Sequence, residues 1–156
     1  MTGPANLMPD PQRHVTLVTG APCSGKSTYV RQHAHPGDVV LDFDIIARQL
    51  GSSRRWRHET AIREAAEEIM RARLAAVATA KRGVFWVIRC TPLAQERAAL
   101  ASWLHADRVV VLRPPLSVLM DRALQRPDRR GTVASVRSWV NRWSPAPCDE
   151  VIDTLW

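Results

Sequence analysis

The sequence predicts an α/β fold, a three-layer sandwich in which helices cover both faces of a mostly parallel β-sheet. Two observations indicate this fold. Short runs of β-branched and apolar residues alternate along the chain with longer segments of helical periodicity. The run at residues 84–88 is apolar at every position, which is typical of a strand buried on both faces. The chain has 156 residues, enough for one such sheet, so we expect a single domain over residues 1–156.

The strands are expected where apolar residues follow one another and a polar residue or a turn signal then ends the run. Pro114-Pro115, for example, breaks the fourth run. Strands that alternate with helices form parallel sheets, and ligands of such sheets bind beyond the C-terminal ends of the strands. The four expected strands are residues 15–19, 39–41, 84–88 and 109–112.

The helices are expected between these runs. In the longest one, apolar residues from Ile62 to Val77 recur at three- and four-residue steps and share one face. Residues 1–13, which contain three prolines, are expected to be a loose N-terminal segment, and residues 144–156 an irregular tail. The six expected helices are at about residues 25–34, 45–50, 58–82, 91–104, 116–125 and 133–143.

The stretch VTLVTGAPCSGKST, residues 15–28, carries the most specific motif of the chain. Two glycines five positions apart, followed by Lys-Ser, stand between an expected strand and an expected helix, which is the pattern of a phosphate-binding loop. Lys26 would neutralise the β- and γ-phosphates and Ser27 would ligate Mg²⁺. The motif predicts a P-loop NTPase fold with a nucleoside triphosphate and Mg²⁺ as ligands. The residues expected to contact ATP here are Gly20, Ala21, Pro22, Cys23, Ser24, Gly25, Lys26, Ser27 and Thr28.

Two carboxylates, Asp42 and Asp44, follow the second expected strand. If Asp42 still belongs to the strand, both side chains point to the same side of the rim. One could then deprotonate an acceptor hydroxyl while the other holds Mg²⁺ through water. The alternative is a solvated strand end, or Asp44 as the N-cap of the helix at 45–50. Beside a phosphate loop we favour the catalytic interpretation, and the residues alone do not decide which aspartate is the base.

An arginine cluster near residues 122–130 predicts a lid. Arg122 and Arg126 are four positions apart and would share a helix face. Proline and glycine flank the segment at about 126–131, which indicates a part of the chain that can swing over ATP. Guanidinium groups of Arg122, Arg126 and Arg130 would then offset charge on the phosphates, with Arg126 acting in catalysis. The alternative is a basic, solvated helix end.

Composition bounds the partners of the protein. The net charge of +7 favours a polyanionic partner, although only two of the 22 basic residues are lysines, an arginine bias that a GC-rich coding sequence also explains. The three cysteines show no spacing typical of a zinc site or a disulfide framework. No apolar run is long enough to span a bilayer, so we expect a cytoplasmic protein that does not bind membranes.

Four stretches carry a family resemblance: GAPCSGKST, VVLDFDIIARQLG, GVFWVIRCTP with the helix after it, and LMDRALQR followed by RRGT. Over roughly residues 15–143 the chain resembles the P-loop kinases of the polynucleotide-kinase type, small AAA-like domains common in phage and bacterial genomes. A phage-encoded member would work in the host cytoplasm. The resemblance implies roles for these residues: Lys26, Ser27 and Thr28 at triphosphate and Mg²⁺, Asp44 as general base, Arg48 at a substrate phosphate, and Arg122 and Arg126 in the lid.

The chain departs from the family pattern at two places. Cys23 stands where the phosphate loop usually has glycine or another small residue, and Arg89-Cys90-Thr91 stands where the family usually has an aspartate. The second departure raises the prospect of a divergent substrate.

Three functions remain open at this point. The first is ATP-dependent phosphoryl transfer to a hydroxyl of a nucleic acid, a 5′-OH end, which the basic loop Arg54-Arg55-Trp56-Arg57 fits if arginines pair with phosphates and Trp56 stacks on a base. The second is a kinase of a small molecule such as a nucleoside, nucleotide or sugar. The third is a slow ATPase that switches a partner. The sequence leaves the oligomeric state open.

Overall fold

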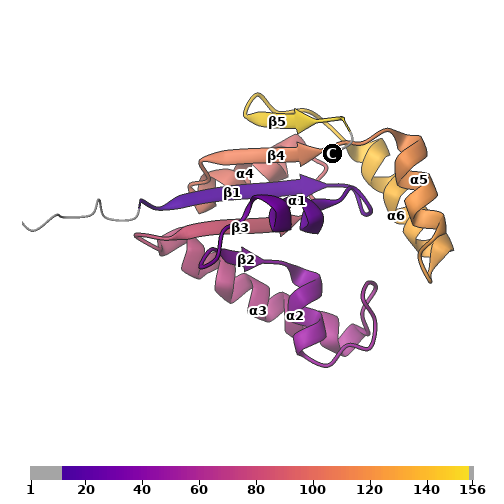
Figure 1. Ribbon diagram of the computed structural model, residues 1–156, viewed down its shortest axis with the longest axis horizontal. Coiled ribbons are helices and arrows are strands. Elements are labelled where there is room, and N and C mark those ends of the chain that lie inside the picture. The colour runs from indigo at the N-terminus through magenta and orange to yellow at the C-terminus, as the bar shows by residue number, and fades with distance from the viewer. Residues whose placement is uncertain (1–11, 155–156) are drawn as a thin grey trace, which may run out of the picture.

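The computed structural model describes residues 12–154, and within them the strands form a single five-stranded sheet of order β2-β3-β1-β4-β5 (Figure 1). Every pair of neighbouring strands is parallel. This confirms the predicted α/β fold with a parallel sheet. The strands are β1 (His14–Gly20), β2 (Val39–Leu41), β3 (Val84–Arg89), β4 (Arg108–Leu112) and β5 (Asp149–Ile152). The predicted loose N-terminal segment lies almost wholly outside the described residues.

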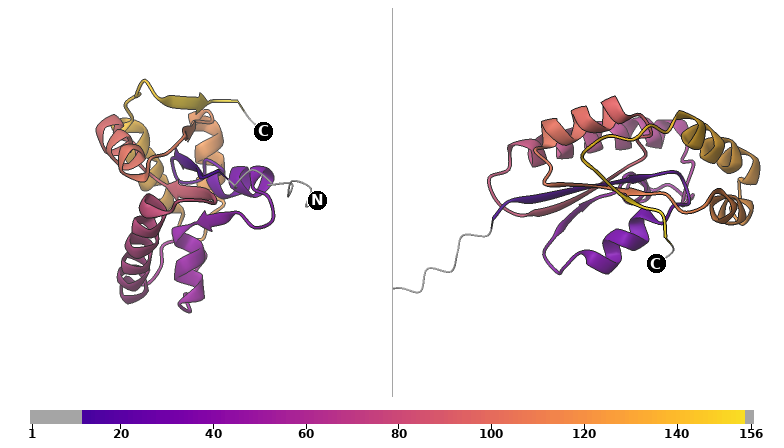
Figure 2. Two further views of the ribbon diagram at one scale, coloured as in Figure 1. Left: turned by 90° about the vertical axis from the view of Figure 1, so that its left-hand side faces the viewer. Right: turned by 90° about the horizontal axis from the view of Figure 1, so that it is seen from above.

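Helices cover both faces of the sheet, so the three predicted layers are present. In Figure 2, α1 lies on one side of the sheet and α4 on the other. Side chains alternate between the faces along each strand. Those packed with α3 and α4 are Val15, Leu17, Val87, Val109 and Val111, and those packed with α1 are Val18, Trp86, Ile88, Val110 and Leu112. The helices are α1 (Lys26–His33), α2 (Phe43–Gln49), α3 (Thr60–Thr79), α4 (Ala94–Leu104), α5 (Leu116–Leu124) and α6 (Arg129–Arg142).

The expectation of an irregular tail after residue 143 is wrong over β5 (Asp149–Ile152), which extends the sheet beyond β4. Tertiary contacts hold this short strand. The Asp149 carboxylate pairs with Arg97, whose side chain is completely buried, and Glu150 pairs with Arg108 on the neighbouring strand. Because these partners are 42 or more positions away, the local sequence does not indicate the strand.

Two helix starts differ from expectation because an aspartate caps each helix earlier. Asp42 accepts a hydrogen bond from the Asp44 backbone N–H, so α2 begins at Phe43, and the alternative in which Asp44 caps that helix is wrong. Asp128 accepts from the backbone N–H of Gly131, so α6 begins at Arg129 rather than at 133. The expected lid is therefore divided between the turn at 126–128 and the first turn of α6.

All five strands end at the same side of the molecule, where α5 and α6 also stand (Figure 1). The helix α5 ends at Leu124, and Arg126 lies in the turn after it. The prediction that Arg122 and Arg126 share a helix face is therefore wrong. No helix within residues 12–154 is long and apolar enough to cross a membrane.

Candidate active site

A cavity of about 980 Å³ opens at the C-terminal ends of the central strands. Four parts of the chain line it: the phosphate loop with the first turn of α1, the start of α2, the loop at 55–57, and the turn between α5 and α6. Residues 89–91, at the end of β3, and residues of α3, α4 and α6 also line it. The volume lies at the upper end of the range typical of small-molecule and cofactor sites, roughly 300–1,000 Å³. The predicted ligand site beyond the C-terminal ends of the strands is therefore a cavity large enough for a nucleotide.

The loop between β1 and α1 has the backbone shape that the motif predicts. A Cβ atom at Gly20 would lie 2.6 Å from the Leu112 carbonyl oxygen, so this position admits only glycine. Gly25 is the N-cap of α1 and has φ of 94°, in the left-handed region that glycine tolerates. Residues 25–28 line the cavity, which places the positive N-terminal end of α1 at its wall. The loop is thus built to bind an anion.

Cys23 lies in the middle of this loop with φ of 68°, a conformation that residues with a side chain rarely adopt. Its side chain is buried, and its carbonyl oxygen accepts a hydrogen bond of 3.0 Å from Arg122 Nη1. Its side chain also interacts with the Arg126 guanidinium. The residue that replaces the family's usual glycine therefore keeps a glycine-like backbone and joins the loop to both predicted lid arginines.

Lys26 and Ser27 open α1 and face different partners. The Lys26 ammonium group folds over the loop and donates to the carbonyl oxygens of Gly20, at 3.0 Å, and Ala21, at 2.8 Å. The Ser27 hydroxyl donates to Asp42 Oδ2 at 2.7 Å. Mg²⁺ prefers oxygen ligands and is usually held by a few protein groups together with phosphate oxygens and water. A serine hydroxyl beside a carboxylate supplies such oxygens, so these residues fit Mg²⁺.

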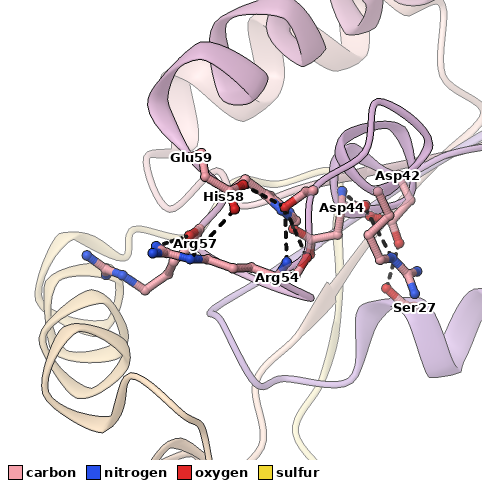
Figure 3. A network of polar contacts seen from close by, with 9 residues as sticks. Ser27, Asp42, Asp44, Arg54, Arg57, His58 and Glu59 are labelled. Carbon is pink, nitrogen blue, oxygen red and sulfur yellow. Dashed lines mark hydrogen bonds and ion pairs between the residues drawn. The ribbon is translucent and has the colours of Figure 1, made fainter.

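The two aspartates do not point the same way, because the chain turns into α2 between them. Asp42 is 5% exposed, and its two carboxylate oxygens bind the Ser27 hydroxyl and the Asp44 backbone N–H. Asp44 lies in the first turn of α2 with its side chain 39% exposed, and its Oδ1 is 2.8 Å from His58 Nε2 (Figure 3). Both line the cavity. The structure thus separates a buried carboxylate, Asp42 at Ser27, from an accessible one, Asp44 at His58.

The other predicted arginines are divided between two surfaces. Arg126 lines the cavity, with its guanidinium 3.2 Å from the centre of the Trp56 ring. Burial lowers the pKa of Arg126, and its electrostatic interaction with Cys23 opposes this shift. Arg48 also lines the cavity from α2. Arg130 is exposed on α6 and borders a separate hollow between α5 and α6, so the structure does not bring it to the phosphate loop.

The loop at 54–57 meets the turn between α5 and α6 across the mouth of the cavity. Trp56 lies against Arg126, and the Arg57 guanidinium pairs with Asp128 at 2.5 Å. Both sides of this contact line the cavity through Trp56, Arg57 and Arg126. The loop at 54–57 and the turn of the predicted lid, which were predicted separately, therefore lie in contact on one side of the cavity.

His58 is the residue that sequence reasoning missed. It was expected only as the start of a helix, yet its side chain is 2% exposed and contacts Asp44. The two residues are 14 positions apart and belong to different elements, so neither spacing nor periodicity marks the pair. One signal could have indicated that His58 belongs to the site. It is the polar run at residues 52–59, near the start of an expected helix, which includes this histidine beside several arginines.

A parallel α/β sheet, a phosphate loop after its first strand and a helix capped by that loop define a P-loop protein. The chain belongs to the AAA domain family, whose model matches residues 15–143. No curated protein matches it.

Solved structures with the same fold include several kinases. A gluconokinase from Sinorhizobium meliloti 1021 is 18% identical, with a TM-score of 0.60 over 92% of this chain and 83% of that one. Shikimate kinase from Acinetobacter baumannii is 18% identical, with a TM-score of 0.54 over 92% and 84%. A chain of the Pnkp1/Rnl/Hen1 RNA repair complex is 16% identical, with a TM-score of 0.58 over 94% of this chain. The protein spans 51% of that last chain. The predicted resemblance to AAA-like domains is confirmed by the family match, and the likeness to P-loop kinases is confirmed in the fold.

Proposed function

We propose that this protein is an ATP-dependent kinase that transfers the γ-phosphoryl group to a hydroxyl. The observation that carries the proposal is a single cavity in which a phosphate loop faces an accessible carboxylate, Asp44, supplied by a different element. In phosphoryl transfer the protein acts chiefly by positioning the reactants and by stabilising charge, and a carboxylate near the phosphates can receive the acceptor's proton.

The residues around the cavity divide the work. The backbone N–H groups of the loop and Lys26 would bind the triphosphate, while Ser27 and Asp42 would hold Mg²⁺. Bound there, Mg²⁺ would neutralise charge on the phosphate oxygens. Arg126, which also lines the cavity, would offset charge that develops on the transferred group.

Asp44 is the general base of this proposal. The acceptor O–H bond breaks and its proton passes to the carboxylate. The acceptor oxygen bonds to the γ-phosphorus, the bond from that phosphorus to the β–γ bridging oxygen breaks, and ADP leaves. Asp42 is the poorer candidate because it is nearly buried and both of its oxygens already accept hydrogen bonds within the protein.

For the acceptor we propose a nucleic acid with a 5′-OH end. The loop beside Asp44 presents exposed arginines at 54, 55 and 57 around the partly buried Trp56, a combination suited to phosphates and bases. The similar chain in an RNA repair complex agrees with this choice. Since ATP is the donor, the proposal keeps the predicted cytoplasmic location.

A small-molecule acceptor is the second candidate, because the cavity volume is within the range of small-ligand sites. The similar gluconokinase and shikimate kinase structures also match this chain over most of their length. Gluconate and shikimate belong to those proteins, and here they serve as members of an acceptor panel.

The test is transfer of labelled γ-phosphate from ATP with Mg²⁺ to 5′-OH DNA and RNA, nucleosides, nucleotides and sugar acids. The chain contains two lysines, so Lys26→Ala has a natural control in Lys81→Ala, at an exposed position. We expect Lys26→Ala to abolish transfer and Lys81→Ala to retain it. Asp44→Asn should lower transfer by about 10²- to 10⁴-fold and leave ATP affinity nearly unchanged. Slow ATP loss without transfer to any acceptor, removed by Lys26→Ala, would contradict the proposal and support an ATPase switch.

A further inference from the structure

The Asp44 carboxylate is held by a chain of hydrogen bonds that leads back to the start of α3 (Figure 3). Its Oδ1 lies 2.8 Å from His58 Nε2, and a carboxylate only accepts hydrogen bonds, so Nε2 carries a hydrogen and donates it. The other ring nitrogen, Nδ1, is 2.8 Å from Ser52 Oγ. The same hydroxyl lies 2.9 Å from Glu59 Oε2, at the N-cap of α3. The chain of hydrogen bonds thus runs through four residues, from the proposed base to a helix terminus.

Burial fixes the middle of this chain. The His58 side chain is 2% exposed and lies beside the Phe43 ring, with ring centres 6.0 Å apart. Both ring nitrogens have partners, and rotation of the ring would break both hydrogen bonds and leave buried polar groups unsatisfied. At the far end, hydrogen bonds from its own backbone and from Ser52 lower the pKa of Glu59, which therefore stays an ionised acceptor.

The Asp44 side chain itself is 39% exposed and would otherwise rotate into solvent. Its second oxygen, Oδ2, makes no hydrogen bond to any residue between 12 and 154. With Oδ1 anchored, the rotamer of the carboxylate is set and Oδ2 is the atom available to an acceptor hydroxyl in the cavity.

We propose that His58 is a positioning residue for phosphoryl transfer, which anchors one oxygen of Asp44 so that the other receives the acceptor's proton. The inference rests on the proposed kinase function. His58 is not among the residues that line the cavity, so it acts through Asp44 alone. Displacement of a reacting group by about 1 Å can lower a rate roughly 10²-fold, so loss of the anchor should reduce the chemical step and leave nucleotide binding unchanged.

The experiment compares His58→Leu, which removes the donor, with His58→Gln, whose side-chain amide can donate from a similar place. We expect His58→Leu to lower kcat about 10- to 100-fold with KM for ATP within about twofold of wild type, and His58→Gln to recover most of that loss. His14 is the matched control, because it pairs with Asp107 and lies at the start of β1, whereas the phosphate loop follows the other end of that strand. His14→Leu should leave kcat unchanged.

Two serines provide a second comparison should His58→Leu fail to fold. Ser52 and Ser53 both donate to Glu59, but Ser52 alone of the two contacts His58. Ser52→Ala should therefore lower kcat severalfold, and Ser53→Ala should not. Equal kcat for the two serine variants, or wild-type kcat in a folded His58→Leu protein, would overturn the inference while the kinase function stands. Absence of transfer by the wild type to every acceptor would overturn both.

Discussion

The buried pair of Arg97 and Asp149 gives the sharpest stability prediction. A guanidinium has five N–H donors, and all five of Arg97 are used: two bind the Asp149 carboxylate and three bind backbone carbonyl oxygens. The side chains are 0% and 1% exposed. Replacement of Asp149 by alanine leaves a charged group in the interior without its counter-ion. The three backbone carbonyl oxygens that accept hydrogen bonds from Arg97 belong to Thr91, Pro92 and Ser144, and they carry no compensating negative charge.

Loss of one partner of a buried ion pair costs about 3–5 kcal/mol. For a chain of this length each kcal/mol lowers Tm by roughly 2–4 °C, so Asp149→Ala should lower Tm by about 6–20 °C. That loss is a large part of a typical total stability of about 5–15 kcal/mol.

The next residue along β5 supplies the control. Glu150 makes the same two-bond contact with an arginine, Arg108, but these side chains are 49% and 40% exposed. Exposed pairs contribute about 0.2–1 kcal/mol, so Glu150→Ala should move Tm by a few degrees at most. Thermal unfolding followed by circular dichroism measures both variants. Equal shifts for Asp149→Ala and Glu150→Ala would refute the reasoning, because burial is the difference between the two pairs.

Two further predictions concern the phosphate loop and the dependence of stability on pH. Because Cys23 has positive φ, Cys23→Gly should be tolerated, whereas the β-branched Cys23→Val should cost about 1–3 kcal/mol, measured by urea unfolding. The hydrogen bond from Arg108 lowers the pKa of Glu150 in the folded protein below its ordinary value of 4.5. The stabilisation by the ionised Glu150 is therefore present above pH 4.5 and is lost as the pH falls through the pKa of Glu150 in the folded protein. The Tm difference between wild type and Glu150→Gln should accordingly disappear in acid. A Tm difference that grows as the pH falls would contradict this prediction.

The elements that the sequence predicts correctly are those whose stability is local or periodic. The first strand was expected at residues 15–19 and spans His14–Gly20, and the loop after it follows from the fixed backbone demands of Gly20 and Gly25. The long helix α3 buries four apolar residues that share the predicted face. Hydrophobic periodicity and glycine conformation act over a few residues, so a sequence displays them directly.

What the sequence could not predict depends on contacts between distant parts of the chain. The strand β5 contains two acidic residues in four and becomes a strand because Arg97 and Arg108 donate hydrogen bonds to those carboxylates. The anchoring of Asp44 by His58 depends on how the loop at 52–58 folds back over α2. Neither contact has a periodic or spaced signature.

The separation of the two aspartates shows how one local event assigns chemistry. Had the chain stayed extended through Asp44, both carboxylates would face one side of the rim and repel each other. Instead Asp42 caps α2, and the turn that this cap begins carries Asp44 toward His58 while Asp42 stays at Ser27. Carboxylates in different environments can perform different tasks within one site. An Asp42→Asn protein keeps an oxygen for the cap but loses the charge beside Ser27, so the proposed division of work requires that it depend more strongly on Mg²⁺ concentration than Asp44→Asn does.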